Sequence, residues 1–361
     1  MKEIRITRRA VLAALPAGLA AAVIPGRKAK ELPRVGEFVR FADPTTETPV
    51  VRLTSLSNSN LFPCPANRFV SARDRFLIFS SDRTGVFAPF RLDLRTGTVR
   101  QLADTAKLEP RSLCLDETER SLFLLDSGEL REISLSSRGT RALAKDVTGF
   151  AMGRGPSDLL LVREGRLEDA NGTIIATDVT GPCLLMRPGG EGCLFERKTS
   201  GNAEFWYVPM RDSGGVSGKK STLLAQGNIS FPFWSPDGGS VLFLRGVPRG
   251  DVTFSEIHEV LIESGSERPV SPTSQFAAFS PNRDASVFVG SSRSKAQPNV
   301  VLLLRSAQRE MTICEHHASD AASVGPVFAP DSRRVYFESD REGKPALYSV
   351  NVELLVEPTQ S

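Results

Sequence analysis

The sequence predicts an all-β fold, a seven-bladed β-propeller closed by an N-terminal strand. Two observations lead to this prediction. After about residue 43 the chain is a succession of short β-type runs with no convincing helical period longer than two turns. A turn motif recurs, and its prolines, Pro236, Pro281 and Pro330, lie 45 and 49 residues apart, which is the spacing of propeller blades. The 361 residues are 40% hydrophobic and 24% charged, which is an ordinary globular composition.

Each copy of the motif predicts one blade of four antiparallel strands. The most regular copies are Phe233–Gly238, Phe279–Asn282 and Phe328–Asp331, and a β-type run follows each of them. One small twisted sheet cannot bury both of its faces, whereas sheets stacked in a ring bury each other. We therefore expect seven units, at about 57–103, 104–145, 146–180, 181–227, 228–270, 271–315 and 316–354. The motif residues serve as turns and identify the fold rather than the function.

One early β-type run, Thr48–Thr54, belongs to none of the seven units. A leftover N-terminal strand of this kind is expected to pair as the outer strand of the last blade and so to close the ring.

The N-terminus has the pattern of an export signal. Arg8 and Arg9 follow Thr7 and lead into an apolar run over residues 10–24, which is too short for a membrane span of about 20 residues. An uncleaved anchor is the alternative to a cleaved signal. We expect a twin-arginine signal peptide over residues 1–24, a linker over 25–43 and the propeller over 44–356. The protein is then periplasmic or secreted, and its mature chain has no membrane span.

The charge balance excludes a nucleic-acid partner. The formal net charge is +3, and residues 1–24 supply all of this excess. Nothing after residue 24 offers the clustered Lys and Arg residues that release counterions from phosphates. We expect a monomer.

Cysteines and histidines are few. Export would place five cysteines in an oxidising compartment, and Cys183 and Cys193 either pair across a hairpin or are two buried small residues. A three-histidine zinc site would need His258, His316 and His317 together, and adjacent strand residues point to opposite faces. We therefore expect solvated loop histidines. No nucleophile elbow and no phosphate-binding loop occurs in the sequence.

Propeller geometry selects the candidate site residues, because the start of each innermost strand faces the central channel. The positions chosen by this rule are Asn67, Arg68, Arg111, Met186, Arg187, Ser230, Phe231, Gln275 and Asp320–Ser323. Arg111 and Arg187 are expected either to bind carboxylates in bidentate fashion or to be exposed loop arginines. Trp206 and Trp234 either stack on a sugar or belong to the core.

The motifs together resemble a known family. The residues that carry the resemblance are Thr48–Thr54, Phe233–Gly238, Pro326–Asp331 and Tyr336–Tyr348. They are similar to the oligogalacturonate lyases, which are seven-bladed propellers related in architecture to TolB-like propellers. The resemblance covers almost all of the chain after the signal.

The resemblance implies a manganese ion held by several histidines and a glutamine, and a histidine base that removes the C5 proton of a uronic acid for β-elimination. Carried over by position, the family's His-x-His pair falls on Ser323 and Gly325 and its glutamine on Asp320. A further metal histidine falls near Gln275 and the base on Phe231, and an arginine that lies two residues before a tryptophan falls on Glu204. Glu204 is therefore a further candidate for substrate binding.

Loss of the base and of the metal ligands would remove the proton acceptor and the charge that stabilises the intermediate. Asp320 and Gln275 are oxygen donors that could still hold a hard cation such as manganese. The sequence therefore predicts a degenerate relative that binds acidic uronate oligosaccharides, with or without cleaving them. The alternative is a TolB-like propeller that binds another envelope protein without catalysis.

Overall fold

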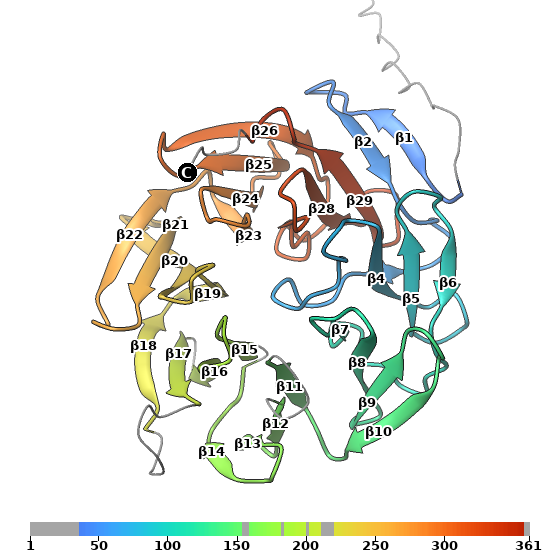
Figure 1. The fold of residues 1–361 in the computed structure, drawn as a ribbon. Helices are drawn as coiled ribbons and strands as arrows, with labels where there is room; N and C mark the ends of the chain where they lie inside the picture. Colours follow the sequence, from blue (N-terminus) through green and yellow to red (C-terminus); the bar gives the residue numbers. More distant parts are fainter. Residues whose placement is uncertain (1–35, 154–158, 182–183, 200–201, 211–219, 357–361) are drawn as a thin grey trace, which may run out of the picture.

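The structure, a computed structural model, describes residues 36–153, 159–181, 184–199, 202–210 and 220–356. Its strands form seven antiparallel sheets arranged around a common centre (Figure 1). This confirms the seven-bladed, all-β prediction. Among the residues described, no helix is long and apolar enough to cross a membrane.

Four strands make up each of the first six blades, named here from the innermost strand outward. Blade 1 holds β3 (Asn60–Leu61), β4 (Phe76–Ser81), β5 (Ala88–Asp93) and β6 (Val99–Gln101). Blade 2 holds β7 (Cys114–Leu115), β8 (Ser121–Asp126), β9 (Glu129–Ser134) and β10 (Thr140–Ala144). Blade 3 holds β11 (Gly149–Met152), β12 (Leu159–Arg163), β13 (Arg166–Asp169) and β14 (Ile174–Ala176).

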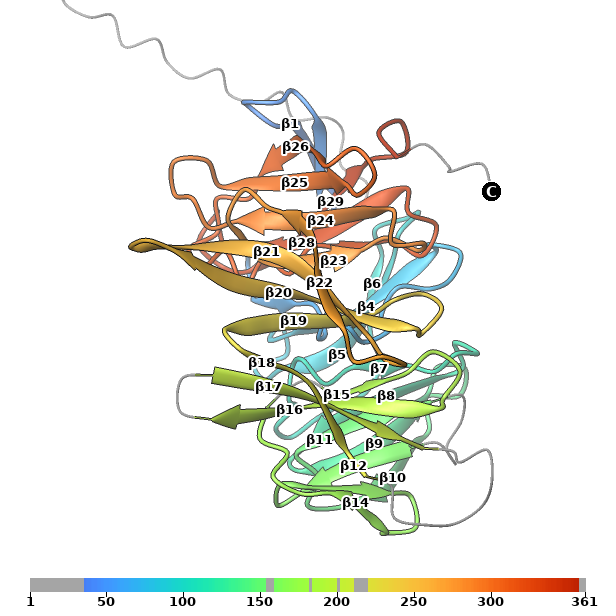
Figure 2. The ribbon, with the colours of Figure 1, turned by 90° about the vertical axis from the view of Figure 1, so that its left-hand side faces the viewer.

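The next three blades repeat this order. Blade 4 holds β15 (Leu184–Met186), β16 (Gly192–Thr199), β17 (Asn202–Pro209) and β18 (Thr222–Gly227). Blade 5 holds β19 (Ile229–Trp234), β20 (Ser240–Arg249), β21 (Val252–Leu261) and β22 (Glu267–Pro272). Blade 6 holds β23 (Phe276–Pro281), β24 (Val287–Ser292), β25 (Asn299–Leu304) and β26 (Arg309–Glu315). In side view the β20–β21 hairpin projects beyond the ring (Figure 2).

The seventh blade joins the two ends of the described chain. It holds β27 (Val327–Phe328), β28 (Arg334–Ser339), β29 (Ala346–Asn351), β2 (Pro49–Arg52) and β1 (Val39–Ala42) in that order. β2 pairs antiparallel with β29, and Val50 lies opposite Val350. β1 begins inside the range expected to be linker, because its residues continue the hairpin that carries β2.

The recurring turn motif works as expected in blade 5. Ser235 N donates to Ser240 O, Gly238 N donates to Ser235 O, and the Asp237 carboxylate accepts from Gly239 N at 2.9 Å. Gly238 has a positive φ of 69°, which glycine adopts without steric cost. The motif residues therefore make the turn between β19 and β20.

Apolar side chains fill the space between neighbouring blades. Phe205 of blade 4 meets Phe243 of blade 5 edge-on at 5.7 Å, and Phe233 meets Phe279 of blade 6 at 5.5 Å. Such buried aromatic side chains each remove a large apolar area from water, at about 25 cal/mol per Å². Packing between blades thus stabilises the ring.

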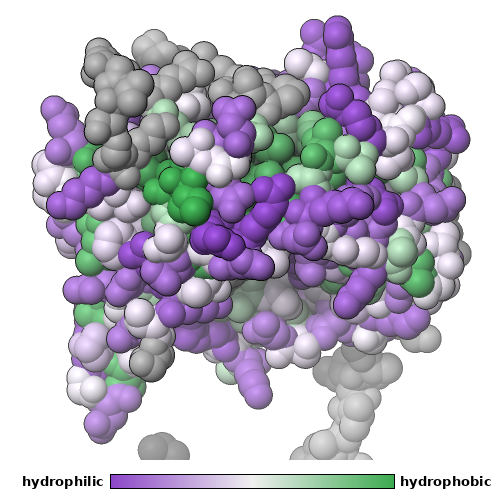
Figure 3. Space-filling model, turned by 90° about the horizontal axis from the view of Figure 1, so that it is seen from below, coloured by the Kyte–Doolittle hydropathy of each residue, from purple (hydrophilic) through white to green (hydrophobic). Residues whose placement is uncertain are grey.

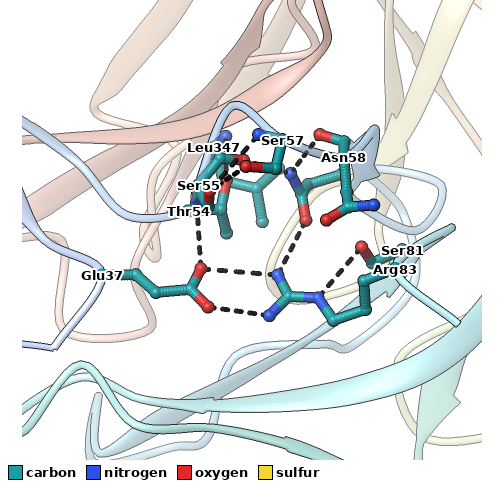
Figure 4. Close-up of polar contacts among 9 residues, drawn as sticks. Glu37, Thr54, Ser55, Ser57, Asn58, Ser81, Arg83 and Leu347 are labelled. Atoms are coloured by element: carbon teal, nitrogen blue, oxygen red, sulfur yellow. Dashed lines mark hydrogen bonds and ion pairs between the residues drawn. The ribbon is translucent and has the colours of Figure 1, made fainter.

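The N-terminal segment also contacts the two blades beside blade 7. The Arg83 guanidinium of blade 1 donates to the Glu37 carboxylate at 2.8 Å and to Asn60 Oδ1 at 3.0 Å, while Ser55 N donates to Glu37 (Figure 4). On the other side, Asp43 accepts from Glu315 N of blade 6 at 3.0 Å. The segment therefore touches blades 1, 6 and 7. That these contacts hold the ring closed remains a prediction.

Two expectations fall on residues outside those described. The signal peptide over residues 1–24 and the first part of the linker precede Gly36, where the description begins. Cys183 also lies outside it, while Cys193 is buried in β16 as an unpaired thiol.

Candidate functional site: the central channel

Two pockets lie along the innermost strands of the ring, and a short segment of blade 1 lines both of them. Residues 62–68 leave the sheet between β3 and the bridge at Val70, and this blue loop reaches toward the middle of the ring (Figure 1). The loop is held against the innermost strand of blade 2, because Cys64 N donates to Arg111 O and Leu115 N donates to Arg68 O. Pro65 and Asn67 line both pockets. We call the pocket at the beginnings of the innermost strands the upper pocket and the other the lower pocket.

The upper pocket has a volume of about 590 Å³ and mixes apolar walls with charged groups. Its apolar lining comes from Leu125, Val162, Val179, Phe150 and Leu184. The charged side chains of its lining are Arg111, Lys198 and the exposed Glu109, which together leave one positive charge in excess. An apolar cleft with a few convergent polar groups is the usual form of a ligand site.

Arg111 is the best-organised cation of the upper pocket. Its Nη2 donates to Glu338 Oε2 at 3.0 Å, and its Nη1 donates to Phe62 O at 2.8 Å and to Glu338 Oε1. Two of the five N–H groups, Nε–H and the second Nη2–H, have no hydrogen-bond acceptor among the residues described. The side chain is 40% exposed, so this edge of the guanidinium is accessible to a ligand.

Glu338 fixes Arg111 from behind. The carboxylate lies on β28 with 5% of its side chain exposed and also accepts from Phe62 N at 2.6 Å. Burial raises the pKa of Glu338, and the charge of Arg111 opposes this rise. The ion pair thus fixes the orientation of Arg111 and uses only the edge of the guanidinium that carries Nη1 and one N–H of Nη2.

Arg187 does not lie with Arg111. Its Nε donates to Gly238 O at 2.8 Å, and its Nη1 contacts the Tyr207 hydroxyl at 3.4 Å, so it fills the lower end of the junction between blades 4 and 5. Arg187 N donates to Gly192 O, and Arg187 O accepts from Gly190 N. Ser235 forms the same pair of bonds in the turn of blade 5, with Ser240 O and Gly238 N. Arg187 is therefore a turn residue after β15 rather than a residue before the strand, which corrects the predicted channel position.

Glu204 and Trp206 lie away from the channel on β17, the third strand of blade 4. The Trp206 Nε1 donates to Glu204 Oε2 at 2.8 Å, and Arg197 stacks 4.2 Å above the indole. These residues bind one another on a blade face. Neither lines the two channel pockets.

Phe231 and Trp234 both lie on β19 but at different heights. Phe231 has a positive φ of 52° and packs against the core between blades 5 and 6. Trp234 lines the lower pocket, and its Nε1 donates to Leu185 O at 3.1 Å. Of the two, Trp234 is the one placed to meet a ligand.

Gln275 and Asp320 both lie near the end of β24. Gln275 O accepts from Arg293 N, and Ser291 Oγ donates to Ala321 O beside Asp320. The described residues contain no group of three or more His, Cys, Asp or Glu side chains that could hold a metal ion. Manganese prefers several imidazole or carboxylate ligands, so the residues present do not fit the ion that the resemblance implies.

His316 lines neither the upper nor the lower pocket but a third pocket of about 390 Å³, which Asp320 also lines. His316 is only 1% exposed, which corrects the expectation of a solvated loop residue. Its Nδ1 accepts from Ala318 N at 3.0 Å, and the ring therefore donates from Nε2 to Ser292 O. His258 lies on β21, where Glu267 binds its Nδ1 at 2.7 Å. No imidazole lines either channel pocket.

Glu338, Lys198 and Pro65 of the inserted loop were not foreseen as site residues. A charged residue directly after the apolar run Val335–Phe337 was the available signal for Glu338, since such a residue is buried only with a partner. Lys198 gave no signal, because it lies near the end of β16, the second strand of blade 4, and not before an innermost strand. The loop interrupts the repeat of blade 1, and the prolines Pro63 and Pro65 mark that interruption.

Comparison with known proteins agrees with the fold. No protein-family model matches the chain. An oligogalacturonide lyase from Pectobacterium atrosepticum is 24% identical over 174 residues, which are 42% of this chain and 43% of that protein. The chain is thus matched to less than half the length of this curated relative.

Solved structures match over more of the chain. An oligogalacturonate lyase in complex with manganese superposes with a TM-score of 0.76 at 18% identity, and another from Vibrio parahaemolyticus superposes with 0.74 at 18% identity. Both matches cover 90% of this chain and 98% of the other. TolB from Acinetobacter baumannii matches 77% of the chain with a TM-score of 0.48. The chain therefore resembles oligogalacturonate lyases, in sequence over part of its length and in its seven-bladed fold over nearly all of it.

Proposed function

We propose that the protein binds acidic uronate oligosaccharides in the upper pocket and does not cleave them by the histidine- and metal-dependent β-elimination of the lyases. Arg111 carries this proposal. Its inner edge is held by Glu338 and its outer edge is accessible, which suits bidentate recognition of a carboxylate. Lys198 on the same lining adds a second positive charge for a neighbouring uronate.

The chemistry of the channel residues supports the proposed loss of the family's reaction. Proton abstraction at C5 needs a base within hydrogen-bond reach and a cation that stabilises the developing charge. The position of the family's base holds Phe231, and no histidine lines the pockets. The likeness to lyases supports the substrate class, and the changed residues support the loss of the reaction.

The test is a thermal-shift titration with trigalacturonate, followed on the same samples by the ultraviolet absorbance of unsaturated uronates. We expect a shift that saturates with ligand and no new absorbance, with or without manganese. Arg111→Lys keeps the charge beside Glu338 but loses the planar fork, so affinity should fall about tenfold. Arg187→Lys is the matched control and should leave the affinity unchanged.

Either of two results would contradict the proposal. The absence of any shift at millimolar trigalacturonate would exclude uronate binding. New absorbance that grows with protein concentration would show that the channel retains lyase activity. If only the Arg111→Lys result fails, the ligand binds but at another place.

The alternative of an envelope-protein partner lacks support on the described surface. A wide apolar patch on one face would have favoured it. The exposed large apolar residues instead lie on several blades: Val86, Ile174, Leu223, Val252, Leu354 and Leu355. On the edge of the ring shown in Figure 3, apolar groups occur in patches between hydrophilic ones.

A further inference from the structure

We propose that the lower pocket is a second, separate binding site that takes an uncharged pyranose ring stacked on Trp234. The pocket has a volume of about 320 Å³. It shares Pro65, Asn67, Phe150 and Leu184 with the upper pocket, whereas Trp234 and Phe233 line the lower pocket alone. This inference does not depend on uronate binding in the upper pocket.

Trp234 is a rigid platform. Its Nε1 bond to Leu185 O fixes the plane of the indole, and Tyr207 meets it edge-on at 5.9 Å between ring centres. The residue is partly buried and lines the pocket together with Phe233 and Phe150. An aromatic face whose orientation is already fixed binds a flat apolar ring surface without a further loss of side-chain freedom.

Polar groups at the same pocket suit hydroxyls. Asn67 Nδ2 donates to Leu113 O at 3.1 Å, which orients the amide and leaves Oδ1 as an acceptor. The guanidinium of Arg68 makes one contact at 3.4 Å, to Glu117 O, and supplies further donors. Aromatic faces combined with a few planar polar groups favour a ligand that is apolar on its face and polar at its edge, as a pyranose is.

The charge of the lower pocket selects a neutral ring. Among the residues that the structure describes, its lining carries one basic side chain, Arg68, and two acidic ones, Asp116 and Glu117. Asp116 accepts from Arg120 N and Ser121 N in its own turn, whereas Glu117 is exposed. A carboxylated sugar would bring a further negative charge to this lining and would be disfavoured. The upper pocket has the opposite excess charge, so the two pockets discriminate between charged and uncharged sugars.

The chain offers a direct optical test, because it contains two tryptophans. In a Trp206→Phe variant, Trp234 is the single emitter. We expect a neutral galactose trisaccharide to change its fluorescence with saturation, and the corresponding galacturonate trisaccharide to change it at least tenfold less effectively. In a Trp234→Phe variant the remaining Trp206, which lies on β17, should not respond to the neutral sugar.

A second variant tests the charge selectivity of the lower pocket with a substitution at an exposed position, where folding should not be disturbed. Glu117 is exposed, and Glu117→Arg in the Trp206→Phe background reverses the charge at the pocket without touching the core. The galacturonate trisaccharide should then change Trp234 emission about as effectively as the neutral one. The proposal is wrong if the neutral sugar leaves Trp234 emission unchanged at millimolar concentration, or if Glu117→Arg does not improve the response to galacturonate.

Discussion

At the scale of single residues, His316 links stability to pH. The buried ring donates from Nε2 to Ser292 O at 3.0 Å and accepts at Nδ1 from Ala318 N at 3.0 Å, an arrangement that requires the neutral form. Burial lowers the pKa of His316 below its ordinary 6.5, and the nearby positive charge of Arg341 acts in the same direction. The unfolded chain therefore binds a proton more readily than the folded one. The free energy of unfolding should fall as the pH drops below about 6.5.

A His316→Gln variant tests this linkage. Glutamine can donate to Ser292 O but cannot also accept from Ala318 N, so the variant should lose about 1 kcal/mol at pH 7.5. Its free energy of unfolding should decline less steeply than that of the wild type between pH 6.5 and 5. Urea titrations at three pH values in this range give both slopes. Parallel slopes would show that His316 does not titrate between the two states.

At the scale of elements, two residues of the hairpin between β1 and β2 form hydrogen bonds with blade 6: Asp43 accepts from Glu315 N, and Thr46 Oγ1 donates to Ile313 O at 3.0 Å. Asp43 is 1% exposed, and its Oδ1 accepts from Thr45 N and Thr46 N while its Oδ2 accepts from Glu315 N at 3.0 Å. In Asp43→Asn the side-chain oxygen can still accept from Thr45 N and Thr46 N. The side-chain NH₂ group then faces Glu315 N, so two donors meet and the bond to blade 6 is lost. The variant should lose about 1–3 kcal/mol of unfolding free energy in urea titrations.

Asp93 provides the matched control for Asp43. It closes the corresponding turn of blade 1, where its Oδ1 accepts from Arg95 N and Thr96 N. Its Oδ2 makes no hydrogen bond among the residues described. Asp93→Asn should therefore cost clearly less than Asp43→Asn. Equal losses would mean that the turn, and not the bond to blade 6, accounts for the effect.

The same elements explain what the sequence could and could not predict. Blade boundaries were predictable because each turn is made by residues within a few positions of one another, as with Ser235 and Gly238. Arg111 and Arg187 looked equivalent, yet Arg187 occupies a degenerate copy of that turn and points between blades. The partner of Arg111, Glu338, is 227 residues away, and no local pattern reveals contacts at that separation.

At the scale of the whole molecule, the N-terminal segment should determine whether the ring stays closed. β2 covers the edge of β29, Glu37 binds Arg83 of blade 1, and Asp43 binds Glu315 of blade 6. A chain that starts at residue 53 loses all three attachments and exposes the backbone of β29 as an unpaired strand edge. Such a chain should unfold at a lower temperature and self-associate in size-exclusion chromatography.

Addition of a peptide of residues 36–52 separates loss of closure from general damage. The peptide must end at residue 52, where β2 ends, because the shortened chain already contains residues 53 and 54. It then supplies the missing strand and both charged contacts, so it should raise the unfolding temperature of the shortened chain with saturation and restore its monomeric elution. Val50 is fully buried against blade 7, and a peptide with Val50→Asp should not bind because it would bury an unpaired charge. If the shortened chain unfolds at the temperature of the full chain, packing between the blades alone closes the ring, and the N-terminal strands only cover its last edge.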